Sequence, residues 1–302
     1  MSAPQDQVRY RGDGLPPPGQ PPLSRRGQRG RYLPGREVIS AVNTALIVEQ
    51  PILVTGEPGT GKTALAWSIA CELGLGSVLE FHTRSDHQAR DVLYSYDALR
   101  RLQDVQLGDR RAQEPGHYVN LQALGEAIKE GAAGRRRVVL IDEIDKAPRD
   151  FPNDLLDEID QWEFTVRETS ERYAATTHPV VVITSNSERQ LPDAFLRRCV
   201  FCFIPFPDEK QLRRILTERL TGQGVSERLG ELAVKAFLRV RQLPELDKPP
   251  ATAELLGWVR VLLKEGVDLE RLASSMHIAE FPALGALLKT QLDYERVKGA
   301  RL

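Results

Sequence analysis

The sequence predicts an α/β fold, an αβα sandwich around a five-stranded parallel sheet, followed by a small all-α domain. Five short apolar runs alternate with helical patterns over residues 31–207, which is the order found in parallel sheets. One run leads into a glycine-rich loop, and another ends in two adjacent carboxylates. From Asp208 onward the apolar residues follow helical spacing, which predicts a separate helical domain over residues 208–302.

The glycine-rich loop is the most specific motif of the chain. It fits the pattern G-x-x-x-x-G-K-[ST] and consists of Gly56, Glu57, Pro58, Gly59, Thr60, Gly61, Lys62 and Thr63. An apolar run at 51–55 precedes it, and helical spacing follows from Lys62 to Leu73. The alternative, an ordinary glycine turn with an exposed lysine, would need neither a strand before it nor a helix after it. In this context backbone N–H groups face phosphate oxygens, Lys62 reaches the β- and γ-phosphates, and the Thr63 hydroxyl ligates Mg²⁺. The sequence therefore predicts a nucleoside triphosphate site.

The bulk composition is typical of a soluble intracellular protein. A net charge of −1 over 302 residues gives no general argument for binding nucleic acid or a membrane. We find no apolar run long enough to span a bilayer and no apolar signal-peptide core, so we expect a cytoplasmic protein. The three cysteines are too few for a disulfide scaffold.

Two pairs of residues have the types that bind metals. Cys199 and Cys202 show C-x-x-C spacing, but they begin an apolar strand and no second pair accompanies them, which favours core residues over a metal or redox site. His82 and His87 have no acidic or third histidine partner at ligand spacing, which favours surface or loop positions. We therefore predict no metal site at either pair.

Residues 1–30 are rich in proline, glycine and arginine and almost lack large apolar groups. Such a segment buries too little surface to offset its ordering entropy, so we expect it to be disordered. Arg25, Arg26 and Arg29 suit contact with RNA, DNA or an acidic partner. A solubilising leader is the alternative.

The remaining elements follow from the spacing of apolar residues. We expect strands at 51–55, 77–82, 136–141, 179–186 and 200–204. Between them we expect helices at 36–49, 62–73, 97–107, 121–131, 151–162 and 191–198, and a β-hairpin at 163–177. The helical domain should contain helices at 208–222, 226–240, 252–264 and 284–298.

The strand at 136–141 leads directly into two carboxylates, Asp142 and Glu143. Ligands of a parallel sheet bind at the carboxyl ends of its strands, so these side chains should lie beside the phosphate loop. Asp142 would hold Mg²⁺, directly or through water, and Glu143 would polarise the attacking water as general base. The strand at 179–186 ends in Asn186, which would lie near the γ-phosphate.

The motifs GEPGTGKT, LIDEIDKAP, TSN and LPDAFLRRCVF, in this order, resemble those of the AAA+ ATPases and, within them, the MoxR-like group. The resemblance covers residues 32–300. It implies that Asn186 is the sensor-1 residue and that Arg198 is the arginine finger, with Arg197 as the second choice. The hairpin at 163–177 resembles the insertion before sensor 1. Two departures stand out. The sensor-2 place, 250–254, holds no arginine, and Arg260 lies two turns further on. Residues 83–120 do not match the MoxR pattern, which implies an outlying subgroup.

This resemblance implies an ATPase that uses ATP and Mg²⁺ and assembles as a homo-oligomer, a hexameric ring. It further implies a chaperone-like role, in which the ring remodels or activates a client protein, often one with a von Willebrand factor A domain. ATP is expected over GTP because of the resemblance and because the chain has no N-K-x-D motif for reading guanine.

Two other functions stay open at this point. A nucleic-acid-directed or defence-associated AAA+ ATPase would use the basic tail, although no basic–aromatic interleaving stands out. A nucleotide-gated switch with slow turnover is the third hypothesis. Glu143 and the candidate finger Arg198 favour hydrolysis over such a switch. An ABC-type ATPase and a kinase are excluded, because the chain has neither an ABC signature nor an H-R-D loop.

Overall fold

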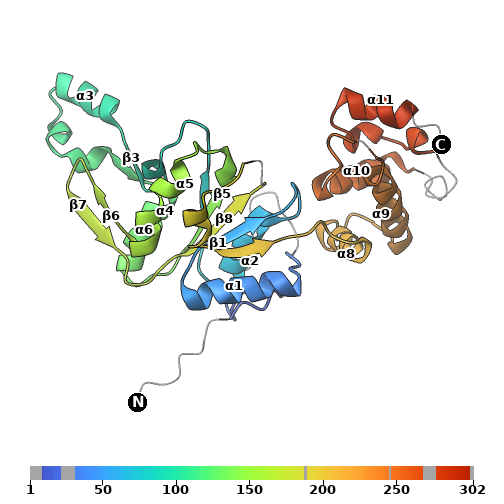
Figure 1. Cartoon of the computed structure of the whole chain (residues 1–302), viewed down its shortest axis with the longest axis horizontal. Coiled ribbons are helices and arrows are strands. Elements are labelled where there is room, and N and C mark those ends of the chain that lie inside the picture. The colour runs from blue at the N-terminus through green and yellow to red at the C-terminus, as the bar shows by residue number, and fades with distance from the viewer. Residues whose placement is uncertain (1–8, 22–30, 187–188, 245, 268–276, 300–302) are drawn as a thin grey trace, which may run out of the picture. The chain divides into compact units, whose positions relative to one another are not determined.

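The structure is a computed structural model that describes residues 9–21, 31–186, 189–244, 246–267 and 277–299 (Figure 1). Its contacts divide the chain into two compact units. The first contains Tyr32–Gly56 and Gly61–Ile204, with the described N-terminal residues 9–21. The second contains the chain from Pro205 onward, with Glu57–Thr60 of the glycine-rich loop. We describe each unit separately.

A five-stranded, entirely parallel sheet forms the centre of the first unit and confirms the predicted fold class. Its strand order is β2-β5-β8-β1-β9. The strands are β1 (Ile52–Thr55), β2 (Leu79–His82), β5 (Val138–Asp142), β8 (Val180–Ser185) and β9 (Val200–Phe203). β1, β5 and β8 are apolar and largely β-branched because they lie in the middle of the sheet with both faces buried.

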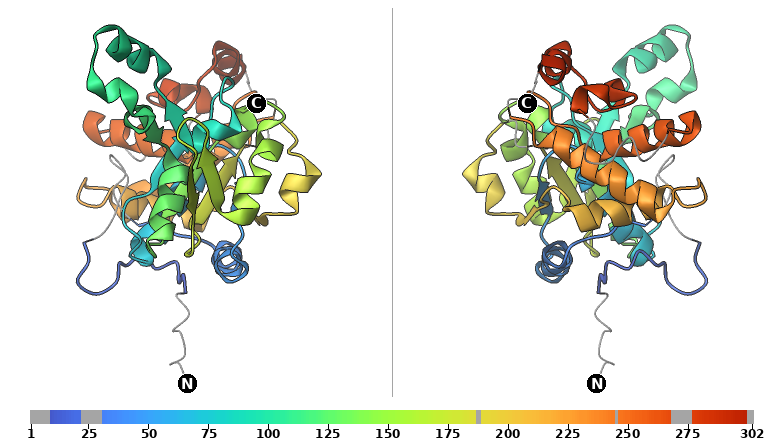
Figure 2. Two further views of the ribbon diagram at one scale, coloured as in Figure 1. Left: turned by 90° about the vertical axis from the view of Figure 1, so that its left-hand side faces the viewer. Right: turned by 90° about the vertical axis from the view of Figure 1, so that its right-hand side faces the viewer.

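Helices cover both faces of this sheet (Figure 2). On one face lie α1 (Arg36–Val48) and α2 (Lys62–Glu72). On the other lie α4 (Ala123–Ala132), α5 (Phe151–Asp154) and α6 (Leu156–Gln161). Alternate strand residues supply the two cores: Ile52 and Val54 pack with α1 and α2, while Leu53 packs on the opposite side.

Between β2 and α4 the chain forms an insertion that projects from the sheet (Figure 1). Two short antiparallel strands close its base, β3 (Tyr94–Tyr96) and β4 (Val119–Leu121). It contains α3 (Ala98–Gln106) and three 3₁₀ turns at Ala89–Val92, Arg110–Gln113 and Pro115–Tyr118. Gly125 permits the base to pack on α4, because a Cβ there would lie 2.0 Å from the Leu93 carbonyl oxygen.

The predicted hairpin is confirmed and lies beside this insertion. It consists of β6 (Glu163–Val166) and β7 (Glu171–Ala174). The Arg167 N–H donates to the Tyr94 hydroxyl at 3.1 Å, and the rings of Tyr94 and Phe164 stack 6.2 Å apart. The insertion and the hairpin thus form one connected surface at the end of the first unit.

Residues 9–21 differ from the disorder expected for the N-terminal segment. Tyr10 is fully buried against α1 and α2, and its hydroxyl lies 2.8 Å from the hydroxyl of Ser68. Its backbone exchanges hydrogen bonds with the Asn43 side chain. The Glu72 carboxylate accepts backbone N–H groups from Arg11, Gly12 and Gly14. One buried ring and these polar anchors order the segment despite its composition. The rest of the tail, including its three arginines, lies outside the described residues.

The second unit is helical, as predicted for the C-terminal region. In the described part of this unit the α-helices are α8 (Glu209–Arg219), α9 (Glu227–Arg241), α10 (Thr252–Glu265) and α11 (Gln291–Gly299). A capping box between Asp208 and Gln211 begins α8. Trp258 and Phe237 are fully buried in its core, and the Trp258 indole donates to the Pro282 carbonyl at 2.8 Å.

Three helices differ clearly from their predicted extents. The helix expected at 191–198 covers only Asp193–Leu196 and ends before the two arginines. The helix expected at 151–162 is divided into α5 and α6 at Leu155. The helix expected at 284–298 is a 3₁₀ turn, Leu284–Ala286, followed by α11. Within the described residues, no helix is long and apolar enough to cross a bilayer.

Candidate nucleotide site

The glycine-rich loop connects β1 to the first turn of α2. Gly56, Gly59 and Gly61 all have positive φ angles, 147°, 77° and 94°, which explains glycine at these positions. Gly61 is also confined, since a Cβ there would lie 2.9 Å from the Tyr32 ring. The Lys62 side chain is only 7% exposed, and its ammonium donates to the Gly56 carbonyl at 2.6 Å. The lysine is thereby folded back over its own loop.

The acidic end of β5 meets the start of α2 at one point. The Thr63 hydroxyl donates to Asp142 Oδ1 at 3.1 Å, although the two residues lie 79 positions apart in the sequence. Hydroxyl and carboxylate oxygens are ligands that suit Mg²⁺, which prefers one or two protein oxygens plus those of water and phosphate. Thr63 and Asp142 therefore fit the magnesium position that the sequence predicts.

Glu143 adopts a left-handed backbone conformation, with φ 58° and ψ 52°, so the chain turns sharply after Asp142. The Glu143 carboxylate accepts a hydrogen bond from the Asn186 side-chain amide at 3.3 Å and pairs with Lys146 at 2.5 Å. The Asn186 backbone N–H donates to the buried carboxylate of Asp145 at 3.0 Å. The structure thus brings Glu143 and Asn186 together at the ends of neighbouring strands.

Two residues that lie beside the acids were given no role at the site in the sequence analysis. Thr184, in β8, contacts Asp142 and Glu143. His82, predicted as a surface or loop residue, ends β2, with Nδ1 3.5 Å from Asp142 and Nε2 3.4 Å from Glu80. Its side chain is 56% exposed. The pairing of β2 with β5 places His82 beside Asp142. The sequence alone does not show this register, so it could not place His82 at the site.

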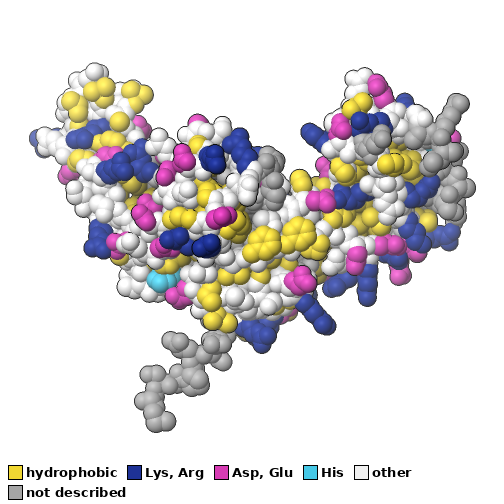
Figure 3. Space-filling view, in the orientation of Figure 1, with side chains coloured by type: hydrophobic (Ala, Val, Ile, Leu, Met, Phe, Trp, Pro, Cys, Tyr) yellow, Lys and Arg dark blue, Asp and Glu magenta, His cyan; other side chains and the backbone are white. Residues whose placement is uncertain are grey.

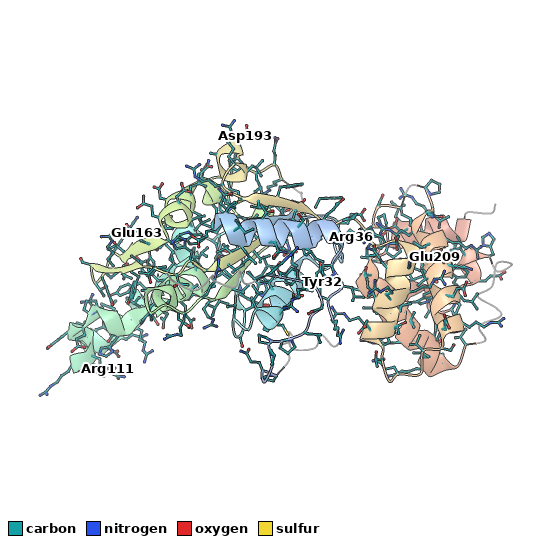
Figure 4. The ribbon with its side chains drawn as sticks, turned by 90° about the horizontal axis from the view of Figure 1, so that it is seen from below. Tyr32, Arg36, Arg111, Glu163, Asp193 and Glu209 are labelled. Carbon is teal, nitrogen blue, oxygen red and sulfur yellow. The ribbon has the colours of Figure 1, made fainter. Side chains whose placement is uncertain are left out.

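The two arginines lie after α7 (Asp193–Leu196), away from the carboxylate ends described above. The Arg198 Nε donates to Asp160 Oδ2 at 2.6 Å, and its Nη1 donates to the Ala194 carbonyl at 3.1 Å. The Arg198 and Asp160 side chains are 40% and 41% exposed. Arg198 therefore forms an ion pair within its own chain, with Asp160. Figure 4 shows that Asp193 and the insertion tip, marked by Arg111, lie on different sides of the first unit.

Residues 51–199 match the family model of the AAA domain, dynein-related subfamily. This region contains the glycine-rich loop, both carboxylates, Asn186 and the two arginines. The match supports an AAA+ ATPase. An AAA domain of this kind accounts for the P-loop α/β fold and implies nucleotide binding. A comparison with curated proteins gives no match.

Of the two cysteines of the C-x-x-C pattern, Cys199 is the last residue of the matched region and Cys202 lies just beyond it. Cys202 is buried in β9, and Cys199 is half-buried before it. Burial raises the pKa of the Cys199 thiol to about 12 and that of Cys202 to about 11, the latter with a smaller effect of Glu37. Both shifts lower the thiolate fraction of these side chains and therefore their reactivity.

Proposed function

We propose that this chain binds ATP with Mg²⁺, hydrolyses it in a ring of several copies, and uses the cycle to remodel or activate a partner protein. In this proposal it is a MoxR-like AAA+ ATPase. The observation that carries it is the contact between Thr63 and Asp142, which brings the phosphate loop and the acidic strand end to one point. A glycine turn with an incidental lysine would need no such contact.

Each residue of the site has a distinct role in the proposal. Lys62 leaves the Gly56 carbonyl and binds the β- and γ-phosphates, since phosphate offers its ammonium a charged partner. Glu143 orients and deprotonates the attacking water. Asn186 donates a hydrogen bond to the Glu143 carboxylate and lies near the γ-phosphate. Bound Mg²⁺, held by Thr63 and Asp142, would neutralise charge on the phosphates.

The ring is supported by exposed groups around Arg198. β9 is an edge strand of the sheet. Its register with β1 places Phe201 and Phe203 on the same sheet face as Leu53. The helices that cover Leu53 on this face do not bury the two phenylalanines. The two rings are 63% and 53% exposed, and hydrophobic atoms are visible on this side of the first unit in Figure 3. Arg198 and these phenylalanines suit contact with a second copy, whose bound phosphate would replace Asp160 as the arginine's partner.

A protein client is supported by the insertion. None of the residues of α3 is buried, yet the helix carries Leu99, Leu102 and Val105 at helical spacing, 67%, 54% and 56% exposed. Such an apolar stripe on a projecting element suits contact with another protein. We propose a von Willebrand factor A domain protein as this client.

Calorimetric titration of ATP in the presence of Mg²⁺ tests the nucleotide site. Lys62→Ala should weaken ATP binding by ~10–10²-fold, because a hydrogen bond to a charged group contributes ~1.5–3 kcal/mol. Lys210→Ala, at an exposed position of α8, is the matched control and should bind as the wild type does. Equal affinity of Lys62→Ala and wild type would refute the assignment.

A further inference from the structure

Thr184 connects both acidic residues of the site through one hydroxyl group. It lies in β8, one residue before the strand ends, and is 1% exposed. Its Oγ1 donates to Asp142 Oδ1 at 2.6 Å and accepts the backbone N–H of Glu143 at 2.9 Å. A hydroxyl has one hydrogen to donate and lone pairs to accept with, so it satisfies both contacts at once.

The strand register explains why the residue at this position can reach both acids. β5 and β8 are parallel neighbours, and their last paired residues are Ile141 and Ile183. The next residues, Asp142 and Thr184, therefore lie side by side where the two strands end. Valine at position 184 would fill nearly the same volume without either bond, whereas serine would keep both.

The bond to the Glu143 amide acts on a residue with an unfavourable backbone. Glu143 is in the left-handed region, which residues with a Cβ occupy only when the surroundings hold them there. Thr184 fixes the amide on the carboxyl-terminal side of Asp142 while also fixing the Asp142 side chain. Because the chain turns between the two acids, their side chains leave the backbone in different directions.

Asp142 Oδ1 also accepts the hydroxyl of Thr63 from the phosphate loop. Two hydroxyls therefore orient the Asp142 carboxylate. One comes from α2, before Asp142 in the sequence, and the other from β8, after it. Groups that hydrogen-bond to a metal-binding carboxylate fix its orientation, and their loss typically costs ~10–100-fold in affinity or activity.

We propose that Thr184 is a positioning residue that holds Asp142 and Glu143 in the arrangement needed for ATP hydrolysis. This inference rests on the proposed function above. Thr184 itself touches neither phosphate nor water in this proposal; it acts through the two acids.

Steady-state kinetics of Thr184→Val and Thr184→Ser test the inference, with thermal melts to establish that both variants fold. Thr184→Val should lower kcat by ~10–100-fold while KM for ATP stays within ~2-fold of wild type, because the phosphate loop is unchanged. Thr184→Ser should keep kcat within ~3-fold of wild type, since it retains the hydroxyl. If Thr184→Val does not fold, Thr184→Ala repeats the comparison with a smaller side chain that also lacks the hydroxyl.

Hydrogen exchange at the Glu143 amide supplies a second readout, in protein without nucleotide or Mg²⁺. Exchange should be slow in wild type and Thr184→Ser and faster in Thr184→Val, because only valine removes the acceptor of that N–H. Equal exchange in all three proteins, a wild-type kcat in Thr184→Val, or equal losses in Val and Ser variants would each overturn the inference. A wild-type protein without ATPase activity would instead refute the proposed function, and the exchange result would still decide the role of Thr184.

Discussion

Two regions of the first unit differ in their polar side chains: the carboxyl ends of β1, β5 and β8, and the end of α7. In the first region these groups are buried or half-buried and hydrogen-bonded within the chain, and in the second they are more exposed. At the strand ends, Lys62 and Thr184 are 7% and 1% exposed, and hydrogen bonds connect the loop, the acids and Asn186. At the end of α7, Arg198 is 40% exposed and pairs with an equally exposed carboxylate. An exposed ion pair contributes only ~0–1 kcal/mol. The first region is therefore fixed within one chain, and the second can exchange its partner at little cost.

Arg198→Ala is the variant for which we expect the largest loss. If Arg198 contacts a phosphate in a neighbouring subunit, the ATPase rate should fall by ~10³–10⁵-fold while ATP binding is nearly unchanged. Asp160→Asn is the matched control, because it removes the intrachain partner and leaves the arginine. Equal losses in both variants would mean that Arg198 acts only through its ion pair with Asp160. A loss in Arg197→Ala alone would assign the finger to Arg197.

Glu143→Gln tests the role of the acidic residues at the end of β5. Glutamine keeps the shape and can still accept from Asn186, but it cannot take a proton from water. The rate should fall by ~10²–10⁴-fold, with ATP still bound. Quenched single-turnover assays measure the chemical step, and a wild-type rate in this variant would show that Glu143 is not the base.

Phe203→Asp tests whether the exposed face of β9 binds a second copy. A buried phenylalanine contributes ~1.5–3 kcal/mol, so its loss should weaken self-association by ~10–10²-fold. Leu107→Asp makes a comparable change at a residue that is 81% exposed on the insertion and should leave association unchanged. Sedimentation with and without ATP measures both, and equal association constants for the two variants would contradict a role of this face.

Tyr10→Phe tests the support behind the phosphate loop and should have the smallest effect. The change removes a buried hydroxyl that pairs with Ser68 on α2, which should lower the free energy of unfolding by ~1 kcal/mol. Ser68→Ala and the double variant complete a cycle that isolates this pair. Additive losses in denaturant titrations would show that the two hydroxyls do not interact.

The sequence predicts the sheet and its order of elements well, because the central strands are apolar runs such as Val138–Ile141 and Val180–Ile183. It predicts the β3–β4 pair poorly, since each strand has only three residues and the two lie on either side of α3. The burial of Tyr10 was missed for a similar reason: its partners Asn43 and Ser68 are distant in sequence.

The candidate site shows the same division. Motifs point to Lys62, Thr63 and Asp142, and the fold brings these residues together. The contacts of Thr184 and His82 with the acids become visible only through strand pairing, although Thr184 begins the TSN motif. The Asp160 partner of Arg198 lies 38 residues earlier in the chain and depends on how α6 packs beside α7. The catalytic roles assigned to these residues remain predictions.

Mixing two inactive variants tests most directly the claim that one chain supplies the acids and another supplies the arginine. Lys62→Ala binds ATP only weakly but keeps Arg198, and Arg198→Ala keeps the nucleotide site but lacks the finger. When the two proteins are mixed at concentrations at which they co-assemble, intact Lys62 sites meet intact Arg198 side chains, and ATPase activity should rise well above the sum of the separate proteins. Co-assembly shown by sedimentation, with no gain in activity, would contradict a site shared between subunits.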